Sequence, residues 1–419
     1  MIKDPSSKER YRKNEKAFSR NRKLGFSNII LIMLRKSVKS LQNSLNEFFS
    51  QIDDNLTKLT ASAYSQARKN LSHQIFIDIN KAAILDNFYM EDEDYDTYKG
   101  HRVLSIDGSK IVLPESDDIR SEFGSIINKN QHGTLPEYSG ALVSILYDVL
   151  NNLAIDSKLK HAHYSEKYIA EEHLDHCFHN DVIICDRGYA SYKFFALILQ
   201  KEAHFIVRCS NNYSNEVKEF LNSDSDDRTF VLKREYLSED KRFPKELSVR
   251  FLKVFLDTGE VEILATSLLD TSKYPIGDFK NLYWMRWGIE TYFGILKNRL
   301  NIENFTGKSS EAVKQDFYST IMVSNYESIM TAEAQKELQA KENNKYDQKV
   351  NKAVSFNTIK NNVIELFLSN TDDLDDLFQK MDQLFLLNPS PIREKRTFER
   401  NTTDKKAVSF HKRQKKIVF

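Results

Sequence analysis

The sequence has few cysteines and glycines, and its apolar runs are short. Its three cysteines form no Cys-x-x-Cys pair, which argues against a disulfide framework and against a cysteine-built zinc site. The longest early apolar run, residues 29–34, is too short for a signal sequence or a membrane span. No phosphate-cradling loop of the type Gly-x-x-x-x-Gly-Lys-Ser/Thr occurs, so no nucleotide cofactor is expected. We therefore expect a cytoplasmic protein that neither binds nor crosses a membrane.

The net charge is also close to zero, at +1, but the charged residues are distributed unevenly along the chain. Residues 1–40 hold 12 Lys or Arg against 3 Asp or Glu, and residues 391–419 hold 10 against 3. Excesses of +9 and +7 at the two ends leave a middle of net −15. Two basic ends around an acidic body favour a polyanionic partner such as DNA.

Hydrophobic periodicity divides the chain into three predicted domains. Residues 1–97 have apolar residues at helical spacing and predict a helical DNA-binding domain, in which Arg20, Arg22 and Lys23 are candidate DNA contacts. Short β-rich runs alternate with helical stretches from residue 98, which predicts an α/β domain over 98–335 with a mixed sheet. Within it, 210–268 reads as a β-rich insertion. Residues 336–419 predict a helical region with a basic tail.

Two aspartates follow apolar strand-like runs. Asp107 in VLSIDGS is followed by glycine, and Asp186 in DVIICDRGY begins a turn that leads into a helix. We expect both to lie where a strand ends, so that a metal ion can reach their carboxylates. Either aspartate alone would more often be a simple turn residue.

A third carboxylate, Glu290, lies on a predicted helix that begins near Asp278. At about 100° per residue, the side chains of Tyr283, Arg286, Glu290 and Lys297 fall within one arc of about 60°. Apolar residues beside that stripe would bury the helix against the sheet and direct Glu290 along its edge. An ordinary amphipathic helix with a solvated polar face is the alternative.

Three converging carboxylates suit phosphodiester chemistry. One divalent ion activates the attacking oxygen and a second stabilises the leaving oxygen. Mg²⁺ prefers oxygen ligands and retains several waters, so two or three Asp or Glu side chains suffice. Arg286 and Lys297 would then contact phosphates beside the bond that is cut.

The segment YWMRWGIETYFGILK contains Tyr283, Arg286, Glu290 and Lys297 at the spacing of a known signature. It resembles the Tyr-Arg-Glu-Lys signature of the DDE transposases of the insertion sequence 4 group. IDGS around Asp107 and DRGY around Asp186 are similar to the other two catalytic blocks of that family. Arg208 in FIVRC is similar to the arginine that follows the second of these blocks. The resemblance covers nearly the whole chain.

The resemblance implies a ribonuclease H-like catalytic core with a β-rich insertion. It implies that Asp107, Asp186 and Glu290 bind two Mg²⁺ ions, with Mn²⁺ as a substitute, and that the other signature residues contact transposon-end DNA. Related enzymes use an inserted tryptophan to hold a flipped base. Here both tryptophans lie inside the signature, so Tyr213 or Tyr236 could stack on that base instead.

The implied function is cleavage of the ends of an insertion sequence and their joining to target DNA. The expected partners are double-stranded DNA, as terminal inverted repeats and target, and a second copy of the chain on that DNA, because two ends need two sets of carboxylates. The protein would then be cytoplasmic and associated with the nucleoid. Alternatives are an inactive, repurposed DNA-binding descendant and a metal-dependent nuclease without strand transfer.

Overall fold

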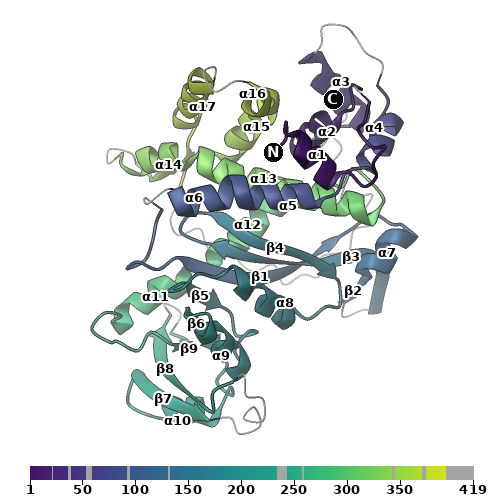
Figure 1. The fold of residues 1–419 in the computed structure, drawn as a ribbon. Coiled ribbons are helices and arrows are strands. Elements are labelled where there is room, and N and C mark those ends of the chain that lie inside the picture. The colour runs from purple at the N-terminus through teal and green to yellow at the C-terminus, as the bar shows by residue number, and fades with distance from the viewer. Residues whose placement is uncertain are drawn as a thin grey trace. The chain divides into compact units, whose positions relative to one another are not determined.

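The computed structural model describes residues 1–20, 22–35, 39–52, 59–91, 95–130, 133–233, 243–256, 259–341, 345–369 and 374–392. Tyr236 and the basic tail from residue 393 onward lie outside these ranges. The chain forms two compact units (Figure 1). Unit 1 comprises Met1–Glu91, Lys110–Ala141 and Gly294–Phe419, and unit 2 comprises Asp92–Ser109 and Leu142–Phe293.

Unit 2 is built on a mixed β-sheet with the strand order β4-β3-β1-β5-β6-β9-β8-β7. Its strands are β1 (Val103–Val112), β3 (Gly133–Asp148), β4 (Leu153–His161), β5 (Val182–Cys185), β6 (His204–Cys209), β7 (Asp227–Lys233), β8 (Glu246–Phe255) and β9 (Val261–Thr266). Strands β1, β5 and β6 run parallel, whereas β9, β8 and β7 continue the sheet antiparallel. Strands β1 and β3 run on into unit 1, where β3 pairs with β2 (Ser125–Asn130). The predicted mixed sheet is confirmed.

The central strand β5 is short and entirely apolar. All four of its residues, VIIC, are buried between the flanking parallel strands β1 and β6. A strand that is covered on both faces has no polar alternation, which is why the sequence shows a continuous apolar run here. The first residue after that run, Asp186, is therefore placed at the end of a central strand.

The segment that was predicted to be β-rich, residues 210–268, contains β7, β8 and β9 and one short helix, α10 (Asn215–Leu221). These strands extend the central sheet through the pairing of β9 with β6. The fully buried Arg250 bonds to both oxygens of Asp227, at 2.7 and 2.6 Å, and to the carbonyls of Leu268 and Tyr274. Its guanidinium thereby links β8 to the chain that leads into the next helix.

The remaining helices of unit 2 lie against this sheet. They are α8 (Glu166–His173), the 3₁₀ turn η2 (Leu174–His176), α9 (Tyr192–Gln200), α11 (Ile276–Trp284) and α12 (Trp287–Asn298), which continues into unit 1. Helix α9 begins at an N-cap, Ser191, whose hydroxyl accepts from Phe194 N, and it packs on β6. Helix α11 packs on β8.

Unit 1 is largely helical (Figure 1). Its elements, besides β2, are α1 (Pro5–Tyr11), α2 (Phe26–Leu34), α3 (Leu41–Ser50), α4 (Ala61–Arg68), α5 (Gln74–Ile79), the π-helical η1 (Asn80–Leu85), α6 (Asp86–Glu91), α7 (Asp117–Phe123), α13 (Ser310–Met330), α14 (Ala332–Gln339), β10 (Gln348–Lys349), α15 (Lys352–Asn361), α16 (Val363–Leu368), α17 (Leu374–Leu387) and β11 (Ser390–Pro391). The predicted helices in residues 26–50 and 62–71 are present as α2, α3 and α4. The helices predicted after residue 336 are present as α14 to α17.

The N-terminal helices share one apolar core with α13. Helix α2 is buried along almost its whole length, and its core extends to Met322 of α13 and Val363 of α16. In the part of the chain that the structure describes, no helix is long and apolar enough to cross a membrane.

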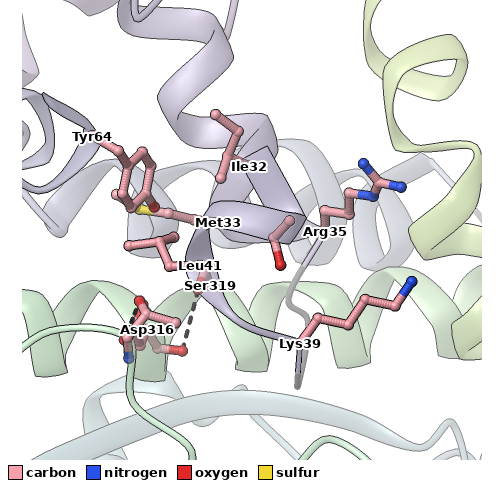
Figure 2. A pocket seen from close by; sticks show the side chains of 10 residues that line it. Ile32, Met33, Arg35, Lys39, Leu41, Tyr64, Asp316 and Ser319 are labelled. Carbon is pink, nitrogen blue, oxygen red and sulfur yellow. Dashed lines mark hydrogen bonds between the residues drawn. The ribbon is translucent and has the colours of Figure 1, made fainter. Parts of the chain in front are cut away.

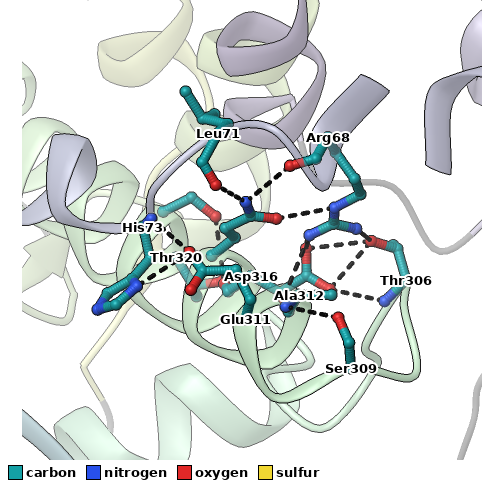
Figure 3. Close-up of polar contacts among 11 residues, drawn as sticks. Arg68, Leu71, His73, Thr306, Ser309, Glu311, Ala312, Asp316 and Thr320 are labelled. Atoms are coloured by element: carbon teal, nitrogen blue, oxygen red, sulfur yellow. Dashed lines mark hydrogen bonds and ion pairs between the residues drawn. The ribbon is translucent and has the colours of Figure 1, made fainter. Parts of the chain in front are cut away.

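A buried polar network joins α4 to α13 (Figure 3). Arg68, which is 3% exposed, donates to Gln315 Oε1 at 2.9 Å, to Asp316 Oδ1 at 2.9 Å and to Ala312 O at 3.1 Å. The Gln315 amide in turn donates to the Arg68 and Leu71 carbonyls. Arg68 is thus a structural residue that ties α4 to α13.

Candidate active site

Asp107 lies in the middle of β1, which continues for five residues to Val112. The expectation that Asp107 ends its strand is therefore wrong, because Gly108 stays extended within the strand. The side chain is half-buried, and Asp107 Oδ1 accepts from Gly108 N at 2.8 Å. The pKa of Asp107 is raised to about 6, chiefly by burial, and the charges of Asp186 and Glu290 contribute to the rise. All three predicted carboxylates therefore lie in one electrostatic neighbourhood of unit 2.

Asp186 directly follows β5, as predicted. Strands β1 and β5 are parallel, and each residue of β1 in this pairing lies opposite the residue 79 positions later, as Ser105 lies opposite Ile184. If this register is continued by two residues, Asp107 lies beside Asp186. Asp186 Oδ1 accepts from Gly188 N at 2.7 Å. A Cβ at position 188 would lie 3.0 Å from that oxygen, so glycine is needed where the turn folds back on the carboxylate.

Glu290 lies in the first turn of α12. This helix approaches the sheet closely because position 288 is glycine, where a Cβ would already be 3.3 Å from Val149. Behind it, the ring of Tyr292 stacks on Tyr147 of β3 with centroids 4.4 Å apart. The buried face of α12 thus fixes the helix against unit 2, while Glu290 is exposed on the other face.

The predicted single helical stripe is interrupted. Tyr283 belongs to α11, Arg286 lies in the turn that follows, and only Glu290 and Lys297 belong to α12. The turn is tightened, because the N–H groups of Arg286 and Ile289 bond to carbonyls three residues back. Arg286 is 8% exposed and Tyr283 is 6% exposed, so neither lies on a solvated face.

Tyr283 and Arg286, which are buried, form a polar cluster with the partly exposed Arg208 beside the carboxylates. Burial raises the pKa of Tyr283, an effect that the cations of Arg286 and Arg208 oppose. Arg286 Nη1 pairs with Glu290 Oε1 at 2.9 Å, and Arg208 pairs with Glu262. The hydroxyl of Tyr283 and the Nε atoms of both arginines are nevertheless buried without a hydrogen-bond partner among the described residues.

The other predicted DNA contacts belong to unit 1. Lys297, in the last turn of α12, is partly buried, and its Nζ donates to Lys110 O at 3.3 Å. Arg20, Arg22 and Lys23 are exposed just before α2.

A pocket of about 40 Å³ lies at the end of α2 (Figure 2). The Arg35 and Lys39 side chains extend on one side of it, away from Tyr64. Arg35 is 7% exposed, and its Nη1 has no hydrogen-bond partner in the described part of the chain. This volume is roughly a tenth of an ordinary ligand site, so the pocket does not accommodate a nucleotide.

Within the described ranges, no group of three or more His, Cys, Asp or Glu side chains is placed to hold a metal ion, and Glu290 instead pairs with Arg286. The donor set still fits a hard divalent cation, because it consists of carboxylates whose mutual repulsion contributes to the raised pKa of Asp107.

Two further residues lie beside the carboxylates, although the sequence pattern assigns no role to either. Glu166, the first residue of α8, packs against Gly108. The Tyr189 hydroxyl is buried near Asp107 and Asp186. The only sequence signal for Tyr189 is its place in DRGY, and Glu166 has none because only the fold brings α8 next to β1.

A mixed sheet that presents acidic side chains beside arginines has the types of side chain that phosphodiester chemistry uses. The family model "Transposase DDE domain" matches residues 98–326, which is more than half of the chain, and the chain belongs to this family, the DDE transposases. It is 23% identical over 315 residues to the transposase InsG for insertion sequence element IS4 of Escherichia coli K12, covering 73% of this chain and 69% of that protein. These matches make it a DNA transposase of the insertion sequence 4 family, whose reaction is metal-dependent DNA cleavage and strand transfer.

A solved structure is also similar, the piggyBac transposase synaptic complex with hairpin DNA. It aligns with a TM-score of 0.40 and 12% identity over 84% of this chain and 74% of that one.

Proposed function

We propose that Asp107, Asp186 and Glu290 hold two divalent cations, Mg²⁺ or in its place Mn²⁺, and that this site cuts and joins the ends of an insertion sequence. The observation that carries the proposal is the register of β1 against β5, which brings Asp186 toward Asp107, and the charges of Asp186 and Glu290 both raise the pKa of Asp107. Bound cations would activate the attacking oxygen and stabilise the leaving oxygen. The fold has to hold three negatively charged side chains close together. The register of β1 against β5 and the close approach of α12 to the sheet both support this arrangement.

The strand order supports a ribonuclease H-like core. Strands β4, β3, β1, β5 and β6 are neighbours in that order, with β1, β5 and β6 parallel. Numbered along the chain, this is the order 3-2-1-4-5. Asp107 lies on β1, the middle strand of these five, and Asp186 follows the neighbouring strand β5. We propose this core for the domain at residues 98–335, with 210–268 as its β-rich insertion.

Tyr283, Arg286 and Arg208 are proposed to contact the phosphates of the end that is cut, and Lys297 to add a fourth contact. Each of the first three has a buried donor without a partner, and such a donor costs about 1–3 kcal/mol. A phosphate oxygen would satisfy these donors. An arginine side chain binds phosphate through its planar fork, so this pair of arginines would give orientation as well as charge.

The remaining assignments concern partners. Residues 1–97 are proposed to bind the terminal inverted repeats, with exposed Arg20, Arg22 and Lys23 as contacts. Residues 336–419 are proposed to support a homodimer that forms on DNA, since one chain has one set of carboxylates and a transposon has two ends. The protein is proposed to act in the cytoplasm, associated with the nucleoid, because its proposed substrate is DNA.

The reaction can be tested with the full-length protein, Mg²⁺ and DNA from the ends of its own element. The proposal expects cuts that leave 3′-hydroxyls, followed by joined products. Binding without cuts would instead show an inactive descendant, and cuts without joined products would show a nuclease. Asp186→Asn is the control, which should bind the same DNA and leave it intact.

A further inference from the structure

A fourth carboxylate lies against the strand that carries Asp107. A Cβ at Gly108 would stand 3.0 to 3.1 Å from three atoms of the Glu166 side chain, Cγ, Cδ and Oε1. Glycine at position 108 is therefore what lets this carboxylate lie directly beside β1. Among the described residues, Glu166 makes no hydrogen bond or ion pair, although three other acidic residues of α8 and η2, Glu171, Glu172 and Asp175, each pair with a lysine.

A buried hydroxyl lies in the same neighbourhood. Tyr189 is 3% exposed, and its Oη has no hydrogen-bond partner in the described ranges. Burial raises the pKa of Tyr189, and the nearby Cys185, Asp107, Glu166 and Asp186 raise it further. Its ring lies near the ring of Phe194, and a phenylalanine at position 189 could make the same contact. The hydroxyl is therefore a buried donor without an acceptor among the described residues.

These two observations are independent, since one concerns a close contact and the other an unsatisfied donor. We propose that Glu166 is a fourth active-site carboxylate that binds the cations through their waters, and that the Tyr189 hydroxyl positions the carboxylates by donating to them. The proposal rests on the cation site proposed above. Mg²⁺ retains several waters, and carboxylates and hydroxyls outside its direct ligands are what orient those waters.

A structural role is the competing explanation for both residues. Glu166 lies in the first turn of α8, where an acidic side chain stabilises the helix dipole. The ring of Tyr189 fills a buried space. These roles predict effects on stability, whereas the proposal predicts effects on cation affinity, so the two explanations can be separated.

The test measures Mn²⁺ binding to the full-length protein by titration calorimetry, with Mn²⁺ alone as the probe. Glu166→Gln and Tyr189→Phe should each weaken binding by about 10-fold to 100-fold, as is usual for residues that support metal ligands. Glu172→Gln is the matched control, because Glu172 lies on the same helix and pairs with Lys160 at 2.9 Å. It should bind Mn²⁺ like the wild type. Thermal unfolding of both test variants should match the wild type.

Asp107→Asn separates the two proposals. If it abolishes Mn²⁺ binding while Glu166→Gln and Tyr189→Phe bind normally, the cation site stands and the fourth carboxylate is overturned. If Asp107→Asn binds Mn²⁺ like the wild type, the cation site itself is overturned, and this inference with it. Loss of affinity in Glu166→Gln without loss of thermal stability supports the proposal.

Discussion

Arg286 Nη1 lies 2.9 Å from Glu290 Oε1, so the signature arginine pairs with the signature glutamate four residues further on. Arg286 is buried and Glu290 is exposed. The pair gives the buried guanidinium of Arg286 a counter-charge and engages one oxygen of Glu290. When DNA and cations bind, a phosphate would replace Glu290 as the partner of Arg286. The cations would replace Arg286 as the partner of Glu290.

Arg286→Ala should therefore separate DNA binding from cation binding. We expect weaker binding to end DNA and a salt slope reduced by about one, because one phosphate contact is lost. Mn²⁺ affinity should be kept or increased, because Glu290 loses its competing partner. Fluorescence anisotropy at several salt concentrations and calorimetry measure the two effects. Lys280→Ala, at an exposed position of α11, is the control. An unchanged salt slope would count against phosphate contact.

Arg68→Met should destabilise unit 1 by about 3–5 kcal/mol, because it leaves the buried carboxylate of Asp316 without its cation. The neighbouring Lys69 is exposed, and Lys69→Met should change the free energy of unfolding by less than about 0.5 kcal/mol. Urea unfolding of the full-length variants measures both. Equal stability of the two variants would show that the network of Figure 3 contributes nothing.

Glu311 should make stability depend on pH in the acid range. Burial alone would raise the pKa of Glu311, but hydrogen bonds from His73 and Lys13 outweigh it and lower the pKa to about 2. A carboxylate with a lowered folded-state pKa stabilises fully above its ordinary value of 4.5, and this stabilisation is lost as pH falls toward 2.

Unfolding experiments on the wild type and Glu311→Gln should therefore differ most above pH 4.5 and converge below it. Glu333→Gln, at an exposed position of α14, provides the comparison and should show no such convergence. A difference between wild type and Glu311→Gln that stays constant with pH would contradict the account.

Arg20, Arg22 and Lys23 should contribute to end binding. Replacing all three by alanine should weaken binding to end DNA and reduce the salt slope by up to about three. Lys336→Ala, which removes an exposed charge from α14, should not. These point variants are preferable to deleting residues 1–97, because a deletion would also remove the partners of Met322 in the shared core. Unchanged affinity in the triple variant would place recognition elsewhere.

The sequence predicts those parts of the site that local pattern determines. The continuous apolar run of β5 locates Asp186 at a strand end, and helical periodicity locates Glu290. The sequence does not predict the mid-strand position of Asp107, because a glycine after an aspartate usually indicates a turn. Here Gly108 lies within the strand and makes room for the side chain of Glu166.

Other features depend on contacts that no local pattern contains. The break at Arg286 separates two helices whose apolar spacing is nearly continuous, and the pairing of Arg68 with Asp316 joins residues 248 positions apart. The assignment of the active site to three carboxylates accordingly remains a prediction, supported by their charge coupling.

The most direct test replaces each proposed ligand with cysteine and changes the metal. Thiolate is a soft ligand that Mg²⁺ avoids and Mn²⁺ accepts more readily. Asp107→Cys, Asp186→Cys and Glu290→Cys should each bind end DNA, fail to cleave it in Mg²⁺, and recover cleavage in Mn²⁺. Glu172→Cys should cleave like the wild type in both metals. Near wild-type cleavage in Mg²⁺ by any of the three variants would show that the replaced carboxylate is not a metal ligand.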